Sequence, residues 1–280
     1  MPTILSMKGV CLSFKEKRVL DDLTFSVERG ETYGFLGPSG SGKTTTIKLL
    51  TRQLSKDAGR IELFGRPIED ATDDDYERIG ILSDTSALYE RMSIEDNLRF
   101  YAQIRGKGAA DIDRLLERMG LADDRKTPIK NCSKGMRQRA ALLAALIHTP
   151  ELIFLDEPTS GLDPAARAEV HKMLGELKAA GATVFLTTHD MAEAEGVCDR
   201  VAILNDGSVV TCDTPEALKL RFARNRLTIV TRTRGVVETT KDAAAADLVR
   251  ELLAAGECRS IHSDEPNLEE VFLELTGREF

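Results

Sequence analysis

Gly37-Pro38-Ser39-Gly40-Ser41-Gly42-Lys43-Thr44 is the stretch of sequence that decides the fold. It matches the pattern G-x-x-x-x-G-K-[ST], which forms a phosphate-binding loop between a strand and a helix. The apolar run at residues 32–36 predicts the buried strand. Behind the loop, Ile47, Leu50 and Leu54 recur at helical spacing. A glycine-rich turn can be simple punctuation before a helix, but this strand–loop–helix context favours a phosphate site.

Each part of this loop predicts a contact with a nucleoside triphosphate or its metal ion. The glycines let backbone N–H groups curl around a phosphate, and the following helix points its positive end at the same anion. Lys43 is expected to reach the β- and γ-phosphates, and the Thr44 hydroxyl is expected to bind Mg²⁺. The other expected nucleotide contacts are Gly37, Pro38, Ser39, Gly40, Ser41, Gly42 and Thr45.

The composition of the 280-residue chain is ordinary for a soluble globular protein. Its net charge of −8 argues against general nucleic-acid binding, which needs clustered Lys and Arg. No apolar run approaches the ~18 residues that a membrane helix needs, and no secretory signal is visible at the N-terminus. The five cysteines are scattered and never spaced C-x-x-C, which predicts free thiols in a reducing cytosol.

The pattern of apolar residues predicts an α/β fold with a mostly parallel sheet and helices on both faces. Residues 4–14 and 23–29 alternate as half-buried antiparallel strands do, with residues 15–18 as the loop between them. From about residue 93 to residue 149 the pattern is helical, and strand–helix alternation returns from residue 152. We therefore expect a P-loop NTPase core with an N-terminal antiparallel β subdomain and a helical insert at about residues 85–149.

The sequence pattern changes after roughly residue 219, so we expect one domain at residues 1–218 and a small α/β extension at residues 219–280. A hairpin is predicted around Arg234-Gly235. Two helices are predicted at residues 242–255 and 268–275. The extension carries no recognisable chemistry of its own.

Two carboxylates, Asp156 and Glu157, end the apolar run that begins at Leu152. Ligands of open α/β sheets sit beyond the carboxyl ends of the strands, so Asp156 is expected beside the phosphate loop as a ligand of Mg²⁺. Glu157 is next in line and is expected to orient and deprotonate an attacking water. A lone Asp-Glu pair is usually a solvated acidic turn, but the apolar strand before it and the upstream phosphate loop favour a catalytic site.

Three further motifs resemble those of the ATP-binding cassette (ABC) ATPases. Residues 132–136, Cys-Ser-Lys-Gly-Met, resemble the L-S-G-G-Q motif of that family. Residues 157–164 resemble its stretch from the catalytic Glu through the D-loop, and residues 187–190 resemble its switch-histidine segment. Residues 267–277 are similar to the chain end of ATPases from drug, antibiotic and bacteriocin exporters. Five motifs in the family's order span residues 1–213.

The resemblance implies two cassettes that face head to tail and clamp two ATP molecules. Ser133, Lys134, Gly135 and Met136 of one chain would then meet the nucleotide of the other. Ser133 can also be a plain helix cap, and both roles can hold together. His189 would hydrogen-bond the γ-phosphate.

Two further roles follow from the same resemblance. Asp163 would belong to the loop that couples the two sites. Phe14 takes the family's position for an aromatic ring that stacks on adenine. A core aromatic in a sheet is an equal alternative for Phe14.

The chain departs from the family pattern at three positions. Asp84 stands where the family usually has Gln, and we predict that this carboxylate is a Mg²⁺ ligand in the ATP-bound state. Cys132 replaces Leu, a mild change for a packing position. Lys134 replaces Gly, and it either contacts the partner's nucleotide or points into solvent.

The resemblance implies an ATP-hydrolysing subunit that powers export through a separate transmembrane permease. It would act as a homodimer or as a heterodimer with a second ABC ATPase, at the cytoplasmic face of the cell membrane. The surface at residues 83–97, which includes Leu88, Tyr89 and Met92, is expected to receive the permease, although these residues can also simply pack the insert. The sequence does not identify the transported substrate.

Three alternatives remain open at this point. A cytosolic ABC ATPase in DNA repair or on ribosomes would carry coiled-coil insertions or two cassettes, and this chain has neither. A non-catalytic nucleotide-binding regulator is disfavoured because Glu157 and His189 are present, though Asp84 keeps it open. An importer subunit is the third, and only the sequences of the motifs and of the C-terminal tail favour an exporter.

Overall fold

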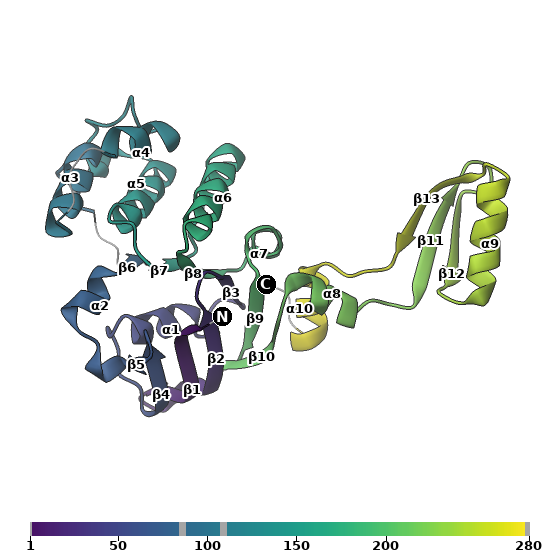
Figure 1. The fold of residues 1–280 in the computed structure, drawn as a ribbon, viewed down its shortest axis with the longest axis horizontal. Helices are drawn as coiled ribbons and strands as arrows, with labels where there is room; N and C mark the ends of the chain where they lie inside the picture. The colour runs from purple at the N-terminus through teal and green to yellow at the C-terminus, as the bar shows by residue number, and fades with distance from the viewer. Residues whose placement is uncertain (1, 84–87, 107–110, 278–280) are drawn as a thin grey trace. The chain divides into compact units, whose positions relative to one another are not determined.

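The computed structural model describes residues 2–83, 88–106 and 111–277 (Figure 1). The chain divides into two compact units, one ending at Asp213 and the other beginning at Thr214. The border predicted between residues 218 and 219 falls inside a helix of the second unit, Pro215–Arg221. Compactness alone does not test which part is an independent domain, so that border stays a prediction.

The first unit contains one antiparallel and one mostly parallel sheet, which confirms the predicted fold class. The antiparallel sheet has the order β2-β1-β4-β5, with β1 Thr3–Phe14, β2 Lys17–Glu28, β4 Ala58–Leu63 and β5 Arg66–Pro67. The larger sheet has the order β10-β9-β3-β8-β7-β6, with β3 Thr32–Leu36, β6 Ile79–Leu82, β7 Leu152–Asp156, β8 Thr183–Thr188, β9 Arg200–Asn205 and β10 Ser208–Asp213. All neighbours in it pair in parallel except β9 and β10.

Helices follow the strands of the larger sheet and build the insert. The helices of the first unit are α1 Lys43–Leu50, η1 Ile68–Asp70, α2 Asp73–Glu77, α3 Ile94–Ile104, α4 Ile112–Arg118, η2 Ile129–Asn131, α5 Lys134–Leu146, α6 Pro164–Ala179 and α7 Met191–Val197. Figure 1 shows α3, α4 and α5 grouped together, away from the antiparallel sheet. No helix in the described ranges is long and apolar enough to cross a membrane.

The helical insert is stabilised by a buried carboxylate, Glu95 on α3. It is 3 % exposed and accepts hydrogen bonds from Arg125 Nε at 2.9 Å and Arg99 Nη2 at 2.7 Å. Lys126 Nζ lies 2.8 Å from the same side chain. The bonds from Arg125, Lys126 and Arg99 lower the pKa of Glu95 to about 2, so the carboxylate stays ionised and holds the loop before α5 against α3.

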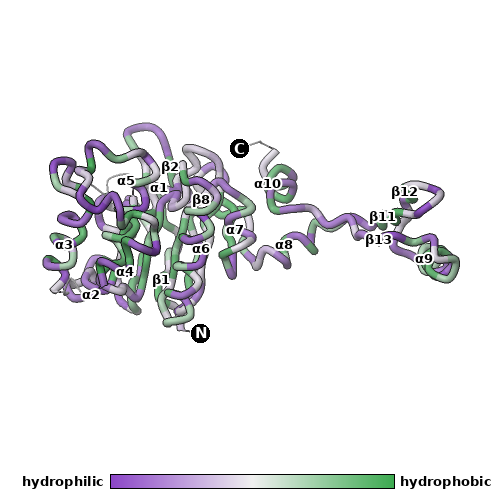
Figure 2. The backbone as a smooth tube through the Cα atoms, turned by 90° about the horizontal axis from the view of Figure 1, so that it is seen from above, coloured by the Kyte–Doolittle hydropathy of each residue, from purple (hydrophilic) through white to green (hydrophobic). Residues whose placement is uncertain are grey.

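The core of the first unit contains an aromatic cluster that joins the two sheets. Phe25 comes from β2, whereas Tyr33 and Phe35 come from β3 and Phe185 from β8. The Phe25 and Phe185 ring centroids are 5.8 Å apart, and those of Phe35 and Phe185 are 5.3 Å apart. Phe154 on β7 packs edge-on against Phe185. The apolar stretches of these strands are green in Figure 2, and their burial fixes the sheet that carries the phosphate loop.

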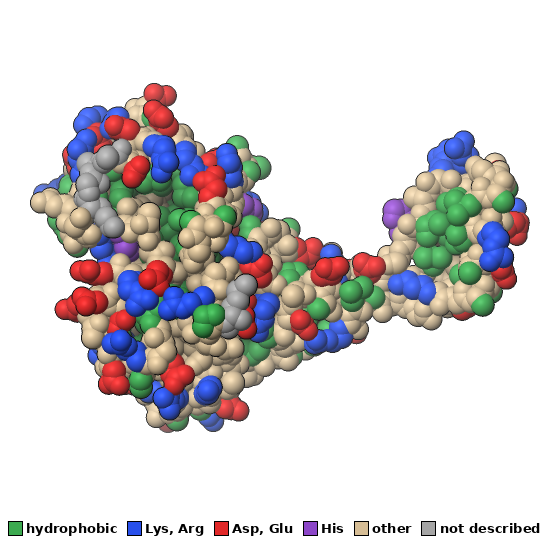
Figure 3. All heavy atoms as spheres, in the orientation of Figure 1, with side chains coloured by type: hydrophobic (Ala, Val, Ile, Leu, Met, Phe, Trp, Pro, Cys, Tyr) green, Lys and Arg blue, Asp and Glu red, His purple; other side chains and the backbone are tan. Residues whose placement is uncertain are grey.

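The second unit is a three-stranded antiparallel sheet with the order β12-β11-β13, accompanied by three helices. Its elements are α8 Pro215–Arg221, β11 Arg226–Thr231, β12 Val236–Thr240, α9 Ala243–Ala254, β13 Cys258–Ser263 and α10 Leu268–Thr276. The predicted hairpin turns at Gly235, where φ is +73°. Figure 3 shows hydrophobic side chains gathered on this unit, whose exposed apolar residues include Val236, Leu253 and Ile261.

One local prediction needs correction, and one strand was not predicted. The loop expected at residues 15–18 is only the turn Lys15-Glu16, and β2 already begins at Lys17, because antiparallel pairing with β1 extends the strand through polar residues. Strand β13 was not predicted, because Cys258–Ser263 alternates few apolar residues and pairs with β11 through its backbone.

The aromatic cluster predicts a large stability difference between two Phe→Ala variants. Phe185 is fully buried, so Phe185→Ala should lower the free energy of unfolding by about 3–5 kcal/mol. Phe14 is 46 % exposed, and Phe14→Ala should change the free energy of unfolding by about 0.5 kcal/mol or less. Denaturant titration of both variants measures the difference, and equal losses would contradict the role given to Phe185.

Candidate functional site

The phosphate loop lies between β3 and α1, and close packing dictates its glycines. Gly42 has φ +110°, and a Cβ there would lie 2.6 Å from Leu20 Cδ2. A Cβ on Gly37 would lie 2.7 Å from the carbonyl oxygen of Leu204. The loop can therefore adopt this conformation only while these positions lack side chains.

Lys43 is folded back onto its own loop. Its Nζ donates to the carbonyl oxygens of Gly37 at 2.6 Å and Pro38 at 3.2 Å. Burial lowers the pKa of Lys43, and the carboxylates of Glu157 and Asp156 oppose this shift. The cation thus sits among backbone acceptors where a triphosphate would offer it stronger ones.

Asp156, at the end of β7, meets the loop through Thr44. The Thr44 hydroxyl donates to Asp156 Oδ2 at 2.8 Å, and the Thr187 hydroxyl donates to Asp156 Oδ1. The parallel register pairs Asp156 with Thr187 on β8. A hydroxyl and a carboxylate that converge in this way offer hard oxygen ligands, so two of the three residues predicted to hold Mg²⁺, Thr44 and Asp156, fit that ion.

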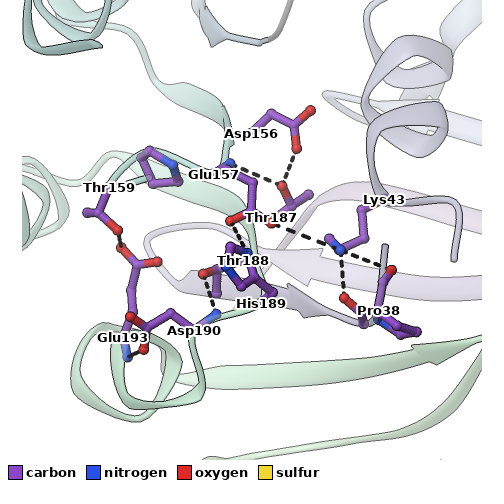
Figure 4. A network of polar contacts seen from close by, with 12 residues as sticks. Pro38, Lys43, Asp156, Glu157, Thr159, Thr187, Thr188, His189, Asp190 and Glu193 are labelled. Carbon is purple, nitrogen blue, oxygen red and sulfur yellow. Dashed lines mark hydrogen bonds and ion pairs between the residues drawn. The ribbon is translucent and has the colours of Figure 1, made fainter. Parts of the chain in front are cut away.

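Glu157 and His189 form a direct pair at the same edge of the sheet (Figure 4). Glu157 Oε2 lies 2.8 Å from His189 Nδ1, and Glu157 Oε1 lies 4.0 Å from Lys43 Nζ. The His189 side chain is 59 % exposed, so it faces the solvent that an incoming nucleotide would displace. The structure therefore brings the three residues expected to be catalytic into one constellation.

The backbone at Glu157 is strained and held from two sides. Its φ is +51°, a left-handed conformation that non-glycine residues rarely adopt. The Glu157 N–H donates to the Thr187 carbonyl at 3.1 Å. Gln138 Nε2 on α5 lies 3.2 Å from the carbonyl oxygens of both Glu157 and Pro158. Sequence reasoning gave Gln138 no role, although it lies on the helix that Ser133 begins.

A cavity of about 650 Å³ is lined by Lys43, Thr44, Asp156 and Glu157, but not by His189. Phe14 lines it and is 46 % exposed, so the alternative of a core aromatic is wrong, and stacking on adenine stays a prediction. Sequence reasoning missed Lys17 and Val19, which line the cavity from β2, the strand that follows Phe14 at the end of β1. The other lining residues are Ser39, Gly40, Gly42, Thr45, Ser83, Lys134, Gln138 and Ser160.

The signature-like segment begins α5. The Ser133 side chain accepts a hydrogen bond from the Met136 N–H at 3.2 Å, so it is a helix cap. Gly135 is half-buried, and Lys134 is exposed. The Lys134 stem lies over the D-loop of its own chain, because a Cβ on Gly161 would lie 3.2 Å from Lys134 Cε.

The remaining predicted site residues are Asp163 and Asp84. Asp163 caps α6 by accepting from the Ala166 N–H at 3.0 Å. Asp84 lies outside the described residues, so its metal role stays a prediction.

Comparison with known proteins agrees with this site. Residues 20–160 match the family described as "ABC transporter". The chain is 42 % identical over 262 residues to a fluoroquinolones export ATP-binding protein of Mycobacterium tuberculosis, which covers 92 % of this chain and 87 % of that protein. It is 36 % identical over 304 residues to the daunorubicin resistance ATP-binding protein DrrA3 of Streptomyces coeruleorubidus, which covers 98 % of this chain and 96 % of that protein.

Solved structures give the same result. A structure described as the ATP binding subunit of an ABC transporter superposes with a TM-score of 0.72 at 32 % identity, over 78 % of this chain and 93 % of that chain. A bacterial Atm1-family ABC exporter with ATP bound has a TM-score of 0.72 at 23 % identity over 78 % of this chain and 40 % of that chain, which supports the fold. The chain therefore belongs to the ABC transporter family, as an ATP-binding subunit with ATPase activity.

Proposed function

We propose that this ATPase powers export through a separate membrane permease, with Glu157 as the catalytic base. The observation that carries the proposal is the Glu157–His189 pair, 2.8 Å apart, within reach of Lys43 and beside the Thr44–Asp156 contact. A base, a phosphate-binding cation and a pair of oxygen donors are the groups that hydrolysis of a triphosphate needs.

Nucleotide binding would exchange contacts that the loop now makes with itself. The triphosphate would take Lys43 Nζ from the carbonyl oxygens of Gly37 and Pro38, while the loop N–H groups bind its oxygens. Phe14 offers an exposed ring for adenine at the same cavity. Thr44 and Asp156 would hold Mg²⁺, which neutralises charge on the phosphates when it is bound.

Hydrolysis then needs a positioned water and a proton acceptor. Glu157 would accept the proton as the water oxygen attacks the γ-phosphorus and the bond to the β-phosphate breaks. His189 touches the same carboxylate, so it would hold the γ-phosphate and Glu157 in one geometry. ADP and inorganic phosphate are the products, and the proton on Glu157 returns to solvent.

The complete site requires a second cassette, identical to this chain or different from it. Ser133 is exposed at the start of the 13-residue helix α5, where N–H groups and the helix dipole favour an anion. We propose that Ser133, Lys134, Gly135 and Met136 meet the nucleotide of that second cassette, with Asp163 in the loop between the two sites. Closure on ATP and reopening after hydrolysis would then drive the permease.

The names of the relatives support export, and an exposed surface on the insert supports docking of a permease. Both relatives quoted above are named for drug export or drug resistance. Tyr89 is 50 % exposed, and Leu88 and Met92 are half-buried beside it. We propose that this surface docks the permease at the cytoplasmic face of the membrane, where the chain would be a peripheral subunit.

Gly42→Ala should remove nucleotide binding, because its Cβ would meet Leu20 at a residue with φ +110°. We expect the Kd for ATP to rise at least about tenfold in a fluorescent-nucleotide titration, which corresponds to about 1.4 kcal/mol. Gly175→Ala on α6 is the matched control, because a Cβ there meets nothing within 4 Å. Unchanged ATP affinity in Gly42→Ala would contradict the proposal that this loop binds the phosphates.

Glu157→Gln should lower ATP turnover about 10²- to 10⁴-fold while ATP still binds, because the amide cannot accept the proton. Phosphate release measures turnover, and a bound-nucleotide assay measures affinity. The exposed Glu117 on α4 provides the control Glu117→Gln, which should turn over at the wild-type rate. Wild-type turnover in Glu157→Gln would remove the catalytic assignment.

Tyr89→Asp should prevent co-purification of the chain with a membrane subunit while the ATPase of the isolated chain persists. Leu253→Asp, at another exposed apolar residue, should leave co-purification intact. Membranes solubilised in detergent, with the captured chains identified by mass spectrometry, supply the measurement. If Tyr89→Asp unfolds the isolated chain, Tyr89 instead packs the insert against Phe100, whose ring centroid is 4.9 Å away.

A further inference from the structure

A buried carboxylate lies behind the Glu157–His189 pair. Glu193, on α7, is 2 % exposed and follows His189 by four residues. Its Oε1 accepts a hydrogen bond of 2.8 Å from the hydroxyl of Thr159, which is 3 % exposed and follows Glu157 by two residues. Figure 4 shows the two side chains pointing toward each other, Thr159 from the turn that follows Glu157 and Glu193 from helix α7, which follows His189.

A contribution to stability alone does not explain why the Glu193 carboxylate is buried here. Glu193 Oε2 has no hydrogen-bond partner among the described residues, and Oε1 lies 3.2 Å from His171 Nε2 in addition to the Thr159 hydroxyl. Burying a half-satisfied carboxylate is unfavourable, whereas an apolar residue of similar size would pack without that cost. A residue of this kind needs another explanation.

The strained backbone at Glu157 offers an explanation for the buried carboxylate. Glu157 has φ +51°, and a strained conformation persists only where its surroundings fix it. Gln138 holds the carbonyl oxygens of Glu157 and Pro158, and Thr187 holds the Glu157 N–H. The Thr159–Glu193 bond anchors the far side of the same turn.

Glu193 also belongs to the segment that carries His189. Its own N–H donates to Asp190 Oδ1 at 3.0 Å, which caps α7 directly after His189. Asp190 in turn pairs with Arg167 on α6. Glu193 thus joins the Glu157 turn, through its side chain, to the segment that carries His189, through its backbone N–H.

We propose that Glu193 is a positioning residue for ATP hydrolysis: through Thr159 it holds the strained turn so that the Glu157 carboxylate stays on His189. This role rests on the proposed function of Glu157 as the base. It assigns Glu193 and Thr159 no contact with nucleotide, so their loss changes the chemical step and leaves ATP affinity in place.

Thr159→Val keeps the shape of the side chain and removes the hydroxyl that Glu193 accepts. We expect kcat to fall about tenfold, because small displacements of a catalytic group are costly, while the KM for ATP stays within about twofold. Thr159→Ser restores the hydroxyl and should recover most of the turnover. Glu193→Gln keeps an acceptor oxygen and should retain more turnover than Thr159→Val.

Thr231→Val is the matched control, since Thr231 is equally buried at 3 % exposure and donates its hydroxyl to the Gly235 carbonyl at 2.8 Å in the second unit. It should lose a similar amount of thermal stability and keep the wild-type kcat. A wild-type kcat in Thr159→Val, or a loss confined to KM, overturns the proposal. If Thr159→Val does not fold, Thr159→Ala takes its place with the same two outcomes.

The Glu157→Gln background separates this proposal from the proposed function. If Glu193 acts through Glu157, adding Thr159→Val should lower the residual single-turnover rate by less than about twofold, because the group being positioned is already lost. A further tenfold loss there shows that Glu193 acts elsewhere. Wild-type turnover in Glu157→Gln alone is the different result that removes Glu157 as the base.

Discussion

The parallel register of β3, β8 and β7 is the constraint on which the site depends. Leu36 pairs with Thr188, and Asp156 pairs with Thr187, so the three strands end at one edge of the sheet. A different part of the site follows each strand: the phosphate loop follows β3, Glu157 follows β7 and His189 follows β8. A shift of one residue in either pairing would move the groups by about 3.3 Å and turn their side chains to the other face.

The catalytic geometry is strained locally and stabilised elsewhere. Gly42 and Glu157 both adopt positive φ, at +110° and +51°. Glycine accepts such a conformation without cost, but Glu157 does not, so its turn needs the bonds from Gln138, Thr187 and Thr159. The aromatic cluster beneath the sheet supplies the buried area that makes this strain tolerable, since the same strands carry both.

Local pattern predicted the parts of the site that are contiguous in sequence. The loop from Gly37 to Thr44 and the strand that ends in Asp156 were recognisable because spacing and context occur within a few residues. Gln138, Thr159 and Glu193 were not, because their roles depend on contacts between residues 19 to 34 positions apart along the chain. The exposure of Phe14 and the extent of β2 likewise depend on tertiary packing. The alternation of apolar and polar residues along the sequence does not reveal that packing.

Helix α5 faces two nucleotide sites at once in the proposed dimer. Its first turn, capped by Ser133, would bind the nucleotide of the other cassette, and Gln138 five residues later holds the Glu157 turn of its own. A helix is stiff over one turn and a half, so in the proposed dimer a displacement of Ser133 by the partner's phosphate would be transmitted to the Glu157 carbonyl. The catalytic turn is therefore suited to respond to nucleotide in both pockets, which is the property that a two-site clamp requires.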